Sequence, residues 1–162
     1  TYLPRAYMVY DARVLTDSAS IFRFMQSKEF EPSRTVVLDA DPGFRTSDTS
    51  YTHQWSAGFT SYNMNSMSLN VATPKDGFLV FSEIYYPGWN AYIDGKPQTI
   101  YRSNWNQRAI PLMAGTHLVE SRFEPASFRN GAWITLATLA LCVGGIVYPS
   151  LRKNTTTEQL SA

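Results

Sequence analysis

The sequence is poor in the residues on which metal, redox and nucleophilic chemistry depend. It contains one cysteine, Cys142, and two histidines, His53 and His117. One cysteine excludes an intrachain disulfide, and a structural zinc site needs four Cys or His ligands. Neither a Gly-rich phosphate loop nor a Ser/His/Asp arrangement is present. We therefore expect no metal and no cofactor on this chain.

Charge is also scarce. Charged residues make up 17% of the chain, and 14 Lys and Arg against 13 Asp and Glu give a formal net charge of +1. Nucleic-acid binders rely on a strongly basic surface, so a nucleic-acid partner is not expected. Hydrophobic residues make up 44% and aromatic residues 14%. This composition excludes a disordered chain and predicts a folded domain with a sizeable core.

One segment lacks charge altogether. Residues 131–151 contain no charged side chain, and as a helix they would span about 31 Å, close to the thickness of a bilayer's hydrocarbon core. Trp133 and Tyr148 lie near the two ends, where amphipathic rings favour the membrane interface. The sequence therefore predicts a transmembrane helix over 129–151, in contact with membrane lipid. A core helix of a soluble protein is the alternative.

The charges beside this segment predict its orientation. Arg152 and Lys153 follow it directly, and basic residues favour the inner side of a membrane. Arg122 and Arg129 precede it and weaken the asymmetry. We expect residues 1–128 to form an extracytoplasmic domain and residues 152–162 to form a cytoplasmic tail. The opening Thr-Tyr-Leu-Pro-Arg predicts a piece of a longer protein.

The first third of the chain predicts a small strand–helix–strand unit. Residues 5–15 favour a strand, and Asp17 or Ser18 is suited to cap a helix over 18–28, with Ile21, Phe22 and Met25 on one face. Residues 34–40 favour a second strand. Residues 41–58 are rich in Ser, Thr and turn formers and predict a long loop. Trp55 in that loop either clamps the domain edge or is an exposed contact residue.

The pattern of the segment from Phe59 onward predicts antiparallel β-structure. Met67, Leu69 and Val71 alternate with polar residues, as in a strand with one buried and one solvent-exposed face. Residues 78–81 are apolar on both faces and predict a central strand. Asp94-Gly95 predicts a hairpin between strands 89–93 and 98–101, and Ala114-Gly115 predicts a turn between strands 108–112 and 116–123. The predicted fold is mainly β: an antiparallel β-sandwich with a small N-terminal strand–helix–strand unit and a C-terminal transmembrane helix.

Several motifs together resemble the C-terminal region of the YfhO-type bacterial membrane protein family. The longest is the run from Gly77 to Lys96, GFLVFSEIYYPGWNAYIDGK; shorter ones are Leu3-Pro4-Arg5-Ala6-Tyr7, Phe30-Glu31-Pro32, Ile100-Tyr101-Arg102, Arg108-Ala109-Ile110, Ala114-Gly115-Thr116-His117 and Phe123-Glu124-Pro125. The resemblance covers most of residues 3–150. Residues 46–58 match poorly, so it supports no binding role for Trp55.

The resemblance implies a large polytopic protein of the GT-C glycosyltransferase type. Such enzymes transfer a sugar from a polyprenyl-phosphate donor to a cell-envelope polymer, lipoteichoic acid in some Gram-positive members. Their catalytic acid lies near the N-terminus of the full protein, outside the matched region. The resemblance therefore carries no catalytic residue onto this chain, and the remainder of the parent protein is an expected partner.

Aromatic residues gather in the long motif. Tyr85, Tyr86, Trp89 and Tyr92 suit a glycan platform, because aromatic faces stack on the apolar faces of sugars. The competing interpretation is that Pro87-Gly88 interrupts a strand and Trp89 fills the core beneath it. Because side chains alternate between the two faces of a strand, we expect Trp89 and Ala91 on one face and Asn90 and Tyr92 on the other.

A polar and aromatic cluster follows. It consists of Asn104, Trp105, Asn106 and Arg108, and its Asn and Arg side chains offer donors for sugar hydroxyls or lipid phosphate. Alternatively, the Asn side chains satisfy local backbone groups. We take the candidate substrate-binding residues to be Tyr86, Trp89, Asn104, Trp105 and Arg108. Asp94 is most simply a turn residue, and His117 a hydrogen-bonded structural residue.

Three functions stay open. The chain assists acceptor or glycan binding in a membrane glycosyltransferase, or it is a structural or protein-interaction cap without sugar affinity. A separate carbohydrate-active enzyme is the third. It would need a carboxylate partner for Asp94, for which Glu83 is the nearest acid of interest, and no second signal supports such a pair.

Overall fold

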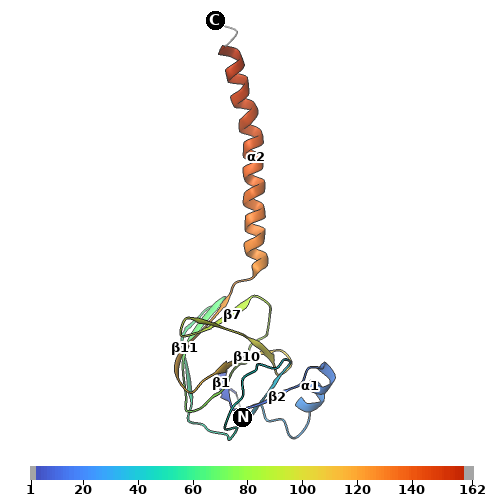
Figure 1. Cartoon of the computed structure of the whole chain (residues 1–162), viewed down its shortest axis with the longest axis vertical. Helices are drawn as coiled ribbons and strands as arrows, with labels where there is room; N and C mark the ends of the chain where they lie inside the picture. Colours follow the sequence, from blue (N-terminus) through green and yellow to red (C-terminus); the bar gives the residue numbers. More distant parts are fainter. Residues whose placement is uncertain (1–2, 159–162) are drawn as a thin grey trace. The chain divides into compact units, whose positions relative to one another are not determined.

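The computed structural model describes residues 3–158, with side chains described up to residue 145. The chain divides into two units, the first ending at Glu124 and the second beginning at Pro125. The first unit is built from β-strands with one short helix, and the second contains one long helix (Figure 1).

The first unit contains strands and one helix in this chain order: β1 (Ala6–Val9), β2 (Asp11–Val14), α1 (Ser18–Met25), β3 (Thr35–Leu38), β4 (Ser56–Tyr62), β5 (Ser66–Thr73), β6 (Gly77–Phe81), β7 (Trp89–Ile93), β8 (Lys96–Gln98), β9 (Tyr101–Ser103), β10 (Gln107–Leu112) and β11 (Gly115–Phe123). One sheet has the order β1-β6-β10-β9-β3-β2, and the other has the order β4-β5-β11-β7-β8. The mainly β fold with two sheets agrees with the predicted sandwich. Strands β2 and β3 precede and follow α1 in the chain and pair with each other in parallel, which confirms the predicted strand–helix–strand unit.

The main core lies between the two sheets and follows the alternation of the strands. Met67, Leu69 and Val71 of β5 are buried and belong to one cluster with residues of β6, β10 and β11. Strand β6 is buried along its whole length and pairs with both β1 and β10, so it is the predicted central strand. Its Phe78 and Val80 belong to a second cluster, against which Phe44 and Trp55 pack. Trp55 therefore clamps the domain, the first of its two interpretations.

The predicted strand over 5–15 is interrupted at Tyr10. Strand β1 pairs with β6 at one edge of its sheet, while β2 pairs with β3 at the opposite edge. The Tyr10 hydroxyl and the Thr73 hydroxyl are 3.0 Å apart and hydrogen-bonded. This change of partner depends on contacts distant in sequence, which strand propensity does not reveal.

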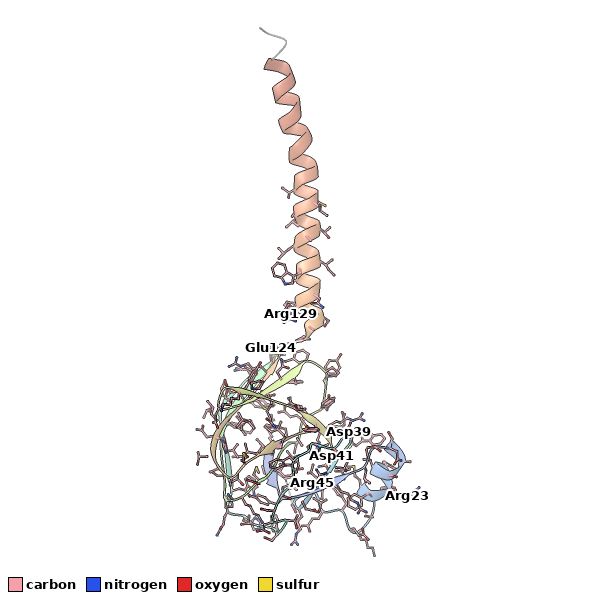
Figure 2. The ribbon with its side chains drawn as sticks, in the orientation of Figure 1. Arg23, Asp39, Asp41, Arg45, Glu124 and Arg129 are labelled. Carbon is pink, nitrogen blue, oxygen red and sulfur yellow. The ribbon has the colours of Figure 1, made fainter. Side chains whose placement is uncertain are left out.

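Helix α1 begins as predicted and ends early. Asp17 is the N-cap, and its carboxylate accepts a hydrogen bond of 2.8 Å from the backbone of Ser20. The helix ends at Met25 rather than residue 28. Ile21 is buried, but Phe22 is 54% exposed, so the predicted shared apolar face is wrong for Phe22. Arg23 lies on the same helix at the surface of the unit (Figure 2).

Two predicted turns form, with different consequences. Asp94 and Gly95 have φ of 52° and 76° and join β7 to β8 as a hairpin. Strand β8 covers 96–98, earlier than the predicted 98–101, and β9 forms separately. The turn at Ala114-Gly115 joins β10 to β11, which belong to different sheets. This turn therefore carries the chain across the core.

The second unit consists of α2 (Ala126–Glu158), which contains the segment predicted to span a membrane. Among the described residues, no helix combines the length and apolar character that a membrane crossing needs. The structure thus gives the predicted transmembrane helix no support. Side chains 146–151 of the predicted span lie outside those described.

Candidate functional site

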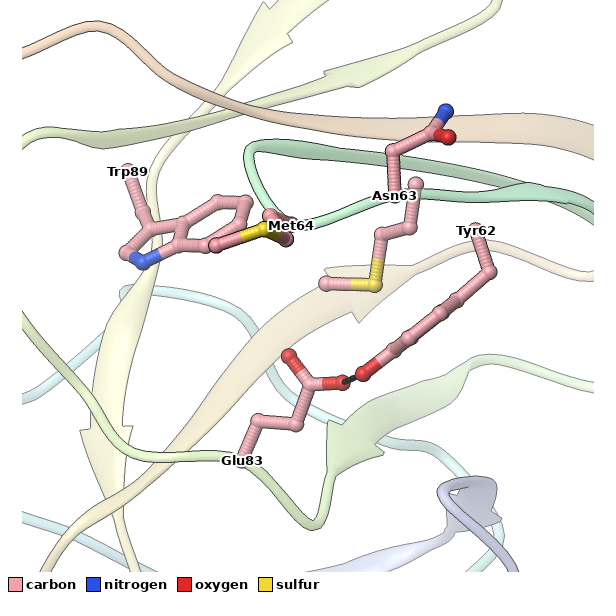
Figure 3. Close-up of a pocket in the computed structure, with 6 residues that line it drawn as sticks. Tyr62, Asn63, Met64, Glu83 and Trp89 are labelled. Atoms are coloured by element: carbon pink, nitrogen blue, oxygen red, sulfur yellow. Dashed lines mark hydrogen bonds between the residues drawn. The ribbon is translucent and has the colours of Figure 1, made fainter.

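The first unit carries an open cleft of 470 Å³ whose lining includes an acid and two aromatic rings. It is lined by Tyr62, Asn63, Met64, Met67, Glu83 and Trp89. These residues come from the β4–β5 hairpin, the segment after β6 and the start of β7. Figure 3 shows the Glu83 carboxylate between the Tyr62 hydroxyl and the indole of Trp89. Small-molecule sites commonly have volumes of about 300–1,000 Å³.

Backbone hydrogen bonds hold the segment that carries Glu83. Ser82 follows the end of β6, and its backbone N–H donates to the carbonyl of Arg5 at 2.8 Å. The Ser82 hydroxyl also donates to the carbonyl of Pro4 at 3.1 Å. Farther along, Gly88 has φ of 111°, in the region that favours glycine, and its carbonyl accepts from the backbone of Glu124 at 2.7 Å. Both ends of the 82–88 loop are therefore anchored.

Arg108 fixes the Glu83 carboxylate from beneath. Arg108, Ile110 and Leu112 alternate along β10, which directs Arg108 toward the core between the sheets. Its side chain is 1% exposed and forms an ion pair with Glu83. The Arg108 guanidinium also donates to the Ser121 hydroxyl at 3.3 Å and lies 4.2 Å from the centre of the Trp89 ring. Burial lowers the pKa of Arg108 below its usual value, and the Glu83 charge opposes that shift.

Tyr62 completes the arrangement around Glu83. Its hydroxyl donates to Glu83 at 2.7 Å, and this hydrogen bond is the main reason that the pKa of Tyr62 is raised. The Tyr62 ring is 48% exposed and packs edge-on against Phe59, with ring centres 5.5 Å apart. The guanidinium of Arg5 lies 4.8 Å from the centre of the Tyr62 ring.

Trp89 also lines a second cleft, of 320 Å³. Tyr86, Asn90 and Tyr92 are among the other residues of this cleft. Phe123 packs against both Tyr86 and Trp89, with ring centres 6.1 Å and 5.5 Å away. Tyr86 is 61% exposed and Trp89 is half-buried. Their aromatic surface is therefore partly open to solvent, and Trp89 contributes to both clefts.

The predicted contact residues divide into two groups. Tyr86, Trp89 and Arg108 come together, although the burial of Arg108 denies it direct access to a ligand. Asn104 and Trp105 lie in the β9–β10 turn and line neither cleft. This turn adjoins the 82–88 loop through a 2.7 Å hydrogen bond from the backbone of Tyr85 to the carbonyl of Asn106.

The Asn104 side chain is hydrogen-bonded within the domain, and Trp105 is exposed. The Asn104 side chain accepts from the backbone of Val37 at 2.9 Å and donates to Gln107 at 3.0 Å, as in the interpretation that Asn satisfies local groups. Trp105 is 50% exposed, and its ring centre is 6.0 Å from that of Phe22. Both turn residues have positive φ, 44° at Asn104 and 74° at Trp105, and a left-handed tryptophan is strained.

Sequence reasoning missed Tyr62 as a site residue and considered Glu83 only as a possible partner of Asp94. The structure pairs Asp94 with His117 instead, at 2.7 Å between His117 Nδ1 and the carboxylate. Asp94 also accepts from the backbone of Leu118 at 2.9 Å, so this pair ties the β7–β8 turn to β11. His117 Nε2 is buried, has no hydrogen-bond partner among the described residues and lies near Gly115.

In the part of the chain described, no group of three or more His, Cys, Asp or Glu side chains is placed to hold a metal ion. The chemistry that the clefts offer is recognition: aromatic surface for stacking and a fixed carboxylate for accepting hydrogen bonds.

Comparisons with known proteins give the chain its family. The model of the family described as "Bacterial membrane protein YfhO" matches residues 48–135. The chain is also 26% identical over 83 residues to the Bacillus subtilis (strain 168) protein described as "Uncharacterized protein YfhO", a match that covers 51% of this chain and 10% of that protein. No solved structure matches. Because the family model covers more than half of the sequence, the chain belongs to the YfhO family of bacterial membrane proteins.

Proposed function

We propose that this chain lies at the outer side of the bacterial membrane and assists glycan binding in a larger glycosyltransferase-like protein. That protein would transfer sugars from a polyprenyl-phosphate donor to a cell-envelope polymer. The chemistry would take place elsewhere in it, and the first unit would hold the acceptor glycan. Family membership supports this proposal, together with the GT-C glycosyltransferase type that the resemblance to the family implies.

The observation that carries the proposal is the aromatic surface of Tyr86 and Trp89. Two rings packed on Phe123 line an open cleft, and Tyr86 is mostly exposed. A large aromatic ring left in solvent forfeits the burial free energy that would stabilise the fold, about 1.5–3 kcal/mol for a large apolar side chain. Such rings are suited to stack on the C–H faces of a sugar. Asn90 and the carboxylate of Glu124, hydrogen-bonded at 2.9 Å, add polar groups beside them.

Binding tests this role directly. The 162-residue chain in detergent would be titrated with purified cell-wall polymer and with simple glycans, with tryptophan fluorescence as the readout. We expect saturable quenching at millimolar sugar, weakened at least 5-fold by Tyr86→Ala. Phe22→Ala is the matched control, because Phe22 is similarly exposed but lines neither cleft. Absence of saturable binding would contradict the proposal.

The location outside the cytoplasm needs a separate test. Lys96 is exposed at the β7–β8 hairpin, so Lys96→Cys presents a thiol at the surface of the first unit. In intact cells, a membrane-impermeant maleimide should label this variant of the full parent protein in a background containing Cys142→Ser. Labelling only after lysis would place the domain inside.

The second candidate is a structural or protein-interaction cap without sugar affinity. Exposed apolar side chains of α2 favour it, among them Phe128, Trp133, Ile134, Leu139 and Leu141. Positions 133, 134 and 136 point in different directions around a helix, and a helix that is apolar all round is normally covered. The remainder of the parent protein would supply that cover. If the chain is such a cap, we expect the parent protein to assemble normally and the chain to bind no glycan.

A further inference from the structure

The Glu83 cleft has a ligand chemistry different from that of the surface around Tyr86. We propose that the cleft between Tyr62 and Trp89 is a subsite for a neutral, hydroxyl-rich ring such as a hexopyranose, and that it rejects phosphate and other anions. This inference rests on the proposed function, because it names the part of the acceptor that the domain would recognise. Trp89 is shared by both clefts, so the two would hold neighbouring units of one polymer.

Glu83 provides the polar recognition. A carboxylate has about four hydrogen-bond acceptor positions. One Glu83 oxygen accepts from the Tyr62 hydroxyl at 2.7 Å, and the other binds Arg108. Each oxygen therefore keeps a free acceptor position, and the side chain is 22% exposed in the cleft. Two hydroxyl groups of a sugar can donate to these positions as charge-assisted hydrogen bonds.

The distribution of charge selects against anions. The residues that line the cleft include one carboxylate and no Lys or Arg. Arg108 balances the Glu83 charge, but its buried guanidinium lies beneath the carboxylate and is packed on Trp89. Arg5 is stacked on the Tyr62 ring and does not line the cleft. A phosphate in the cleft would meet the Glu83 carboxylate in a lining that contains no Lys or Arg, which disfavours its binding.

The walls suit the apolar faces of a sugar ring. Tyr62 and Trp89 lie on either side of the Glu83 carboxylate (Figure 3), and Met64 is another lining residue. Met64 is 94% exposed, and a flexible thioether adapts its shape to a ligand. The cleft thus combines the aromatic surface of Tyr62 and Trp89, the flexible apolar side chain of Met64 and the fixed hydrogen-bond acceptor Glu83.

The test compares ligands and two matched carboxylates. The full chain in detergent would be titrated with the disaccharide gentiobiose, with glycerol 1-phosphate and with inorganic phosphate, followed by calorimetry. We expect millimolar binding of gentiobiose, and no detectable binding of glycerol 1-phosphate or inorganic phosphate. Glu83→Gln should weaken the binding of gentiobiose about 10-fold. Glu120→Gln changes a carboxylate that is 23% exposed in an ion pair with Arg122 and lines neither cleft, and it should change the affinity less than 2-fold.

The outcomes separate the subsite from the proposed function. If gentiobiose binding is lost in Tyr86→Ala but unchanged in Glu83→Gln, the surface at Tyr86 binds sugar and the subsite proposal is overturned. Phosphate binding equal to that of gentiobiose also overturns it. If the unsubstituted chain binds no glycan at all, the proposed function fails as well. Should Glu83→Gln unfold, Tyr62→Ala removes an exposed wall of the cleft and is expected to abolish binding at this subsite.

Discussion

The guanidinium carbon of Arg108 lies 4.2 Å from the centre of the Trp89 ring, and the same guanidinium forms an ion pair with Glu83. One buried cation therefore orients both the aromatic wall and the acid of the cleft. A cation on an aromatic face is stabilising by about 2 kcal/mol when desolvated. Because Arg108 is buried, it does not contact a ligand itself but positions Trp89 and Glu83, which line the cleft.

Replacing Arg108 should destabilise the first unit. Arg108→Met leaves Glu83 without its buried partner, and the loss of one member of such a pair costs about 3 kcal/mol. Urea unfolding of the full chain in detergent measures this change. Arg102→Met is the control, since Arg102 is 45% exposed in its 2.8 Å ion pair with Asp39, and exposed pairs contribute less than about 1 kcal/mol.

The double variant Arg108→Met/Glu83→Gln tests the coupling itself. It should recover about 1–2 kcal/mol relative to the sum of the single variants, because neither charge is then left unpaired. Additive losses would mean that Arg108 stabilises the domain by packing on Trp89, without dependence on Glu83.

Acid should weaken the tie between the β7–β8 turn and β11. Hydrogen bonds from His117, and then from the backbone of Leu118, lower the pKa of Asp94 below its ordinary value. A carboxyl with a depressed pKa in the folded state stabilises the protein above its unfolded pKa, about 3.9. That contribution is lost as pH falls from about 4 through the lower folded pKa.

Asp94→Asn isolates this effect, because asparagine also tolerates the positive φ at this position. We expect a smaller loss of the free energy of unfolding below about pH 4 in the variant than in the parent chain, measured by urea unfolding. Glu29→Gln changes an exposed carboxylate 3.8 Å from Arg13 and should leave the profile unchanged. Identical profiles for Asp94→Asn and the parent chain would remove the pair as a cause of acid sensitivity.

Lys75 should hold the long loop before β4 in place. Its ammonium donates to the Ser50 hydroxyl and pairs with Asp48, both at 2.9 Å, and lies 4.7 Å from the centre of the Tyr10 ring. Hydrogen bonds from Ser50 and Lys75 lower the pKa of Asp48 to about 2. In Lys75→Met, we expect faster amide exchange over 43–54 and a higher pKa for Asp48, both measured by NMR. Lys96→Met should change neither.

The sequence predicts local features of this fold better than distant ones. Alternation identifies the buried face of β5, and Asp94-Gly95 identifies a hairpin, because each depends on adjacent residues. The break at Tyr10 and the contact of Tyr62 with Glu83 join residues far apart in the chain. No local pattern contains that information.

Arg108 shows how the site could have been predicted better. The apolar residues Ile110 and Leu112 share its face of β10, so alternation already directs Arg108 into the core. A buried arginine needs an acid, and Glu83 directly follows Ser82 at the end of the neighbouring strand β6. The exposed rings are different: nothing in the sequence separates Tyr86, which is mostly exposed, from the less exposed Trp89.

Gly77 at the start of β6 should not tolerate a side chain. A Cβ there would lie 2.8 Å from the Val9 carbonyl oxygen and 2.8 Å from the Tyr10 ring, and the carbonyl belongs to backbone that cannot yield cheaply. Gly77→Ala is therefore expected to destabilise the first unit by more than about 1 kcal/mol, although replacing glycine usually stabilises by restricting the unfolded chain. Gly58 in the edge strand β4 is the matched control, because a Cβ at Gly58 would have nothing within 4 Å. Gly58→Ala should be neutral or stabilising by up to about 1 kcal/mol in the same urea unfolding experiment. Equal effects of the two substitutions would show that β1 can move away from β6, and the close approach of these strands would then contribute little to the stability of the core.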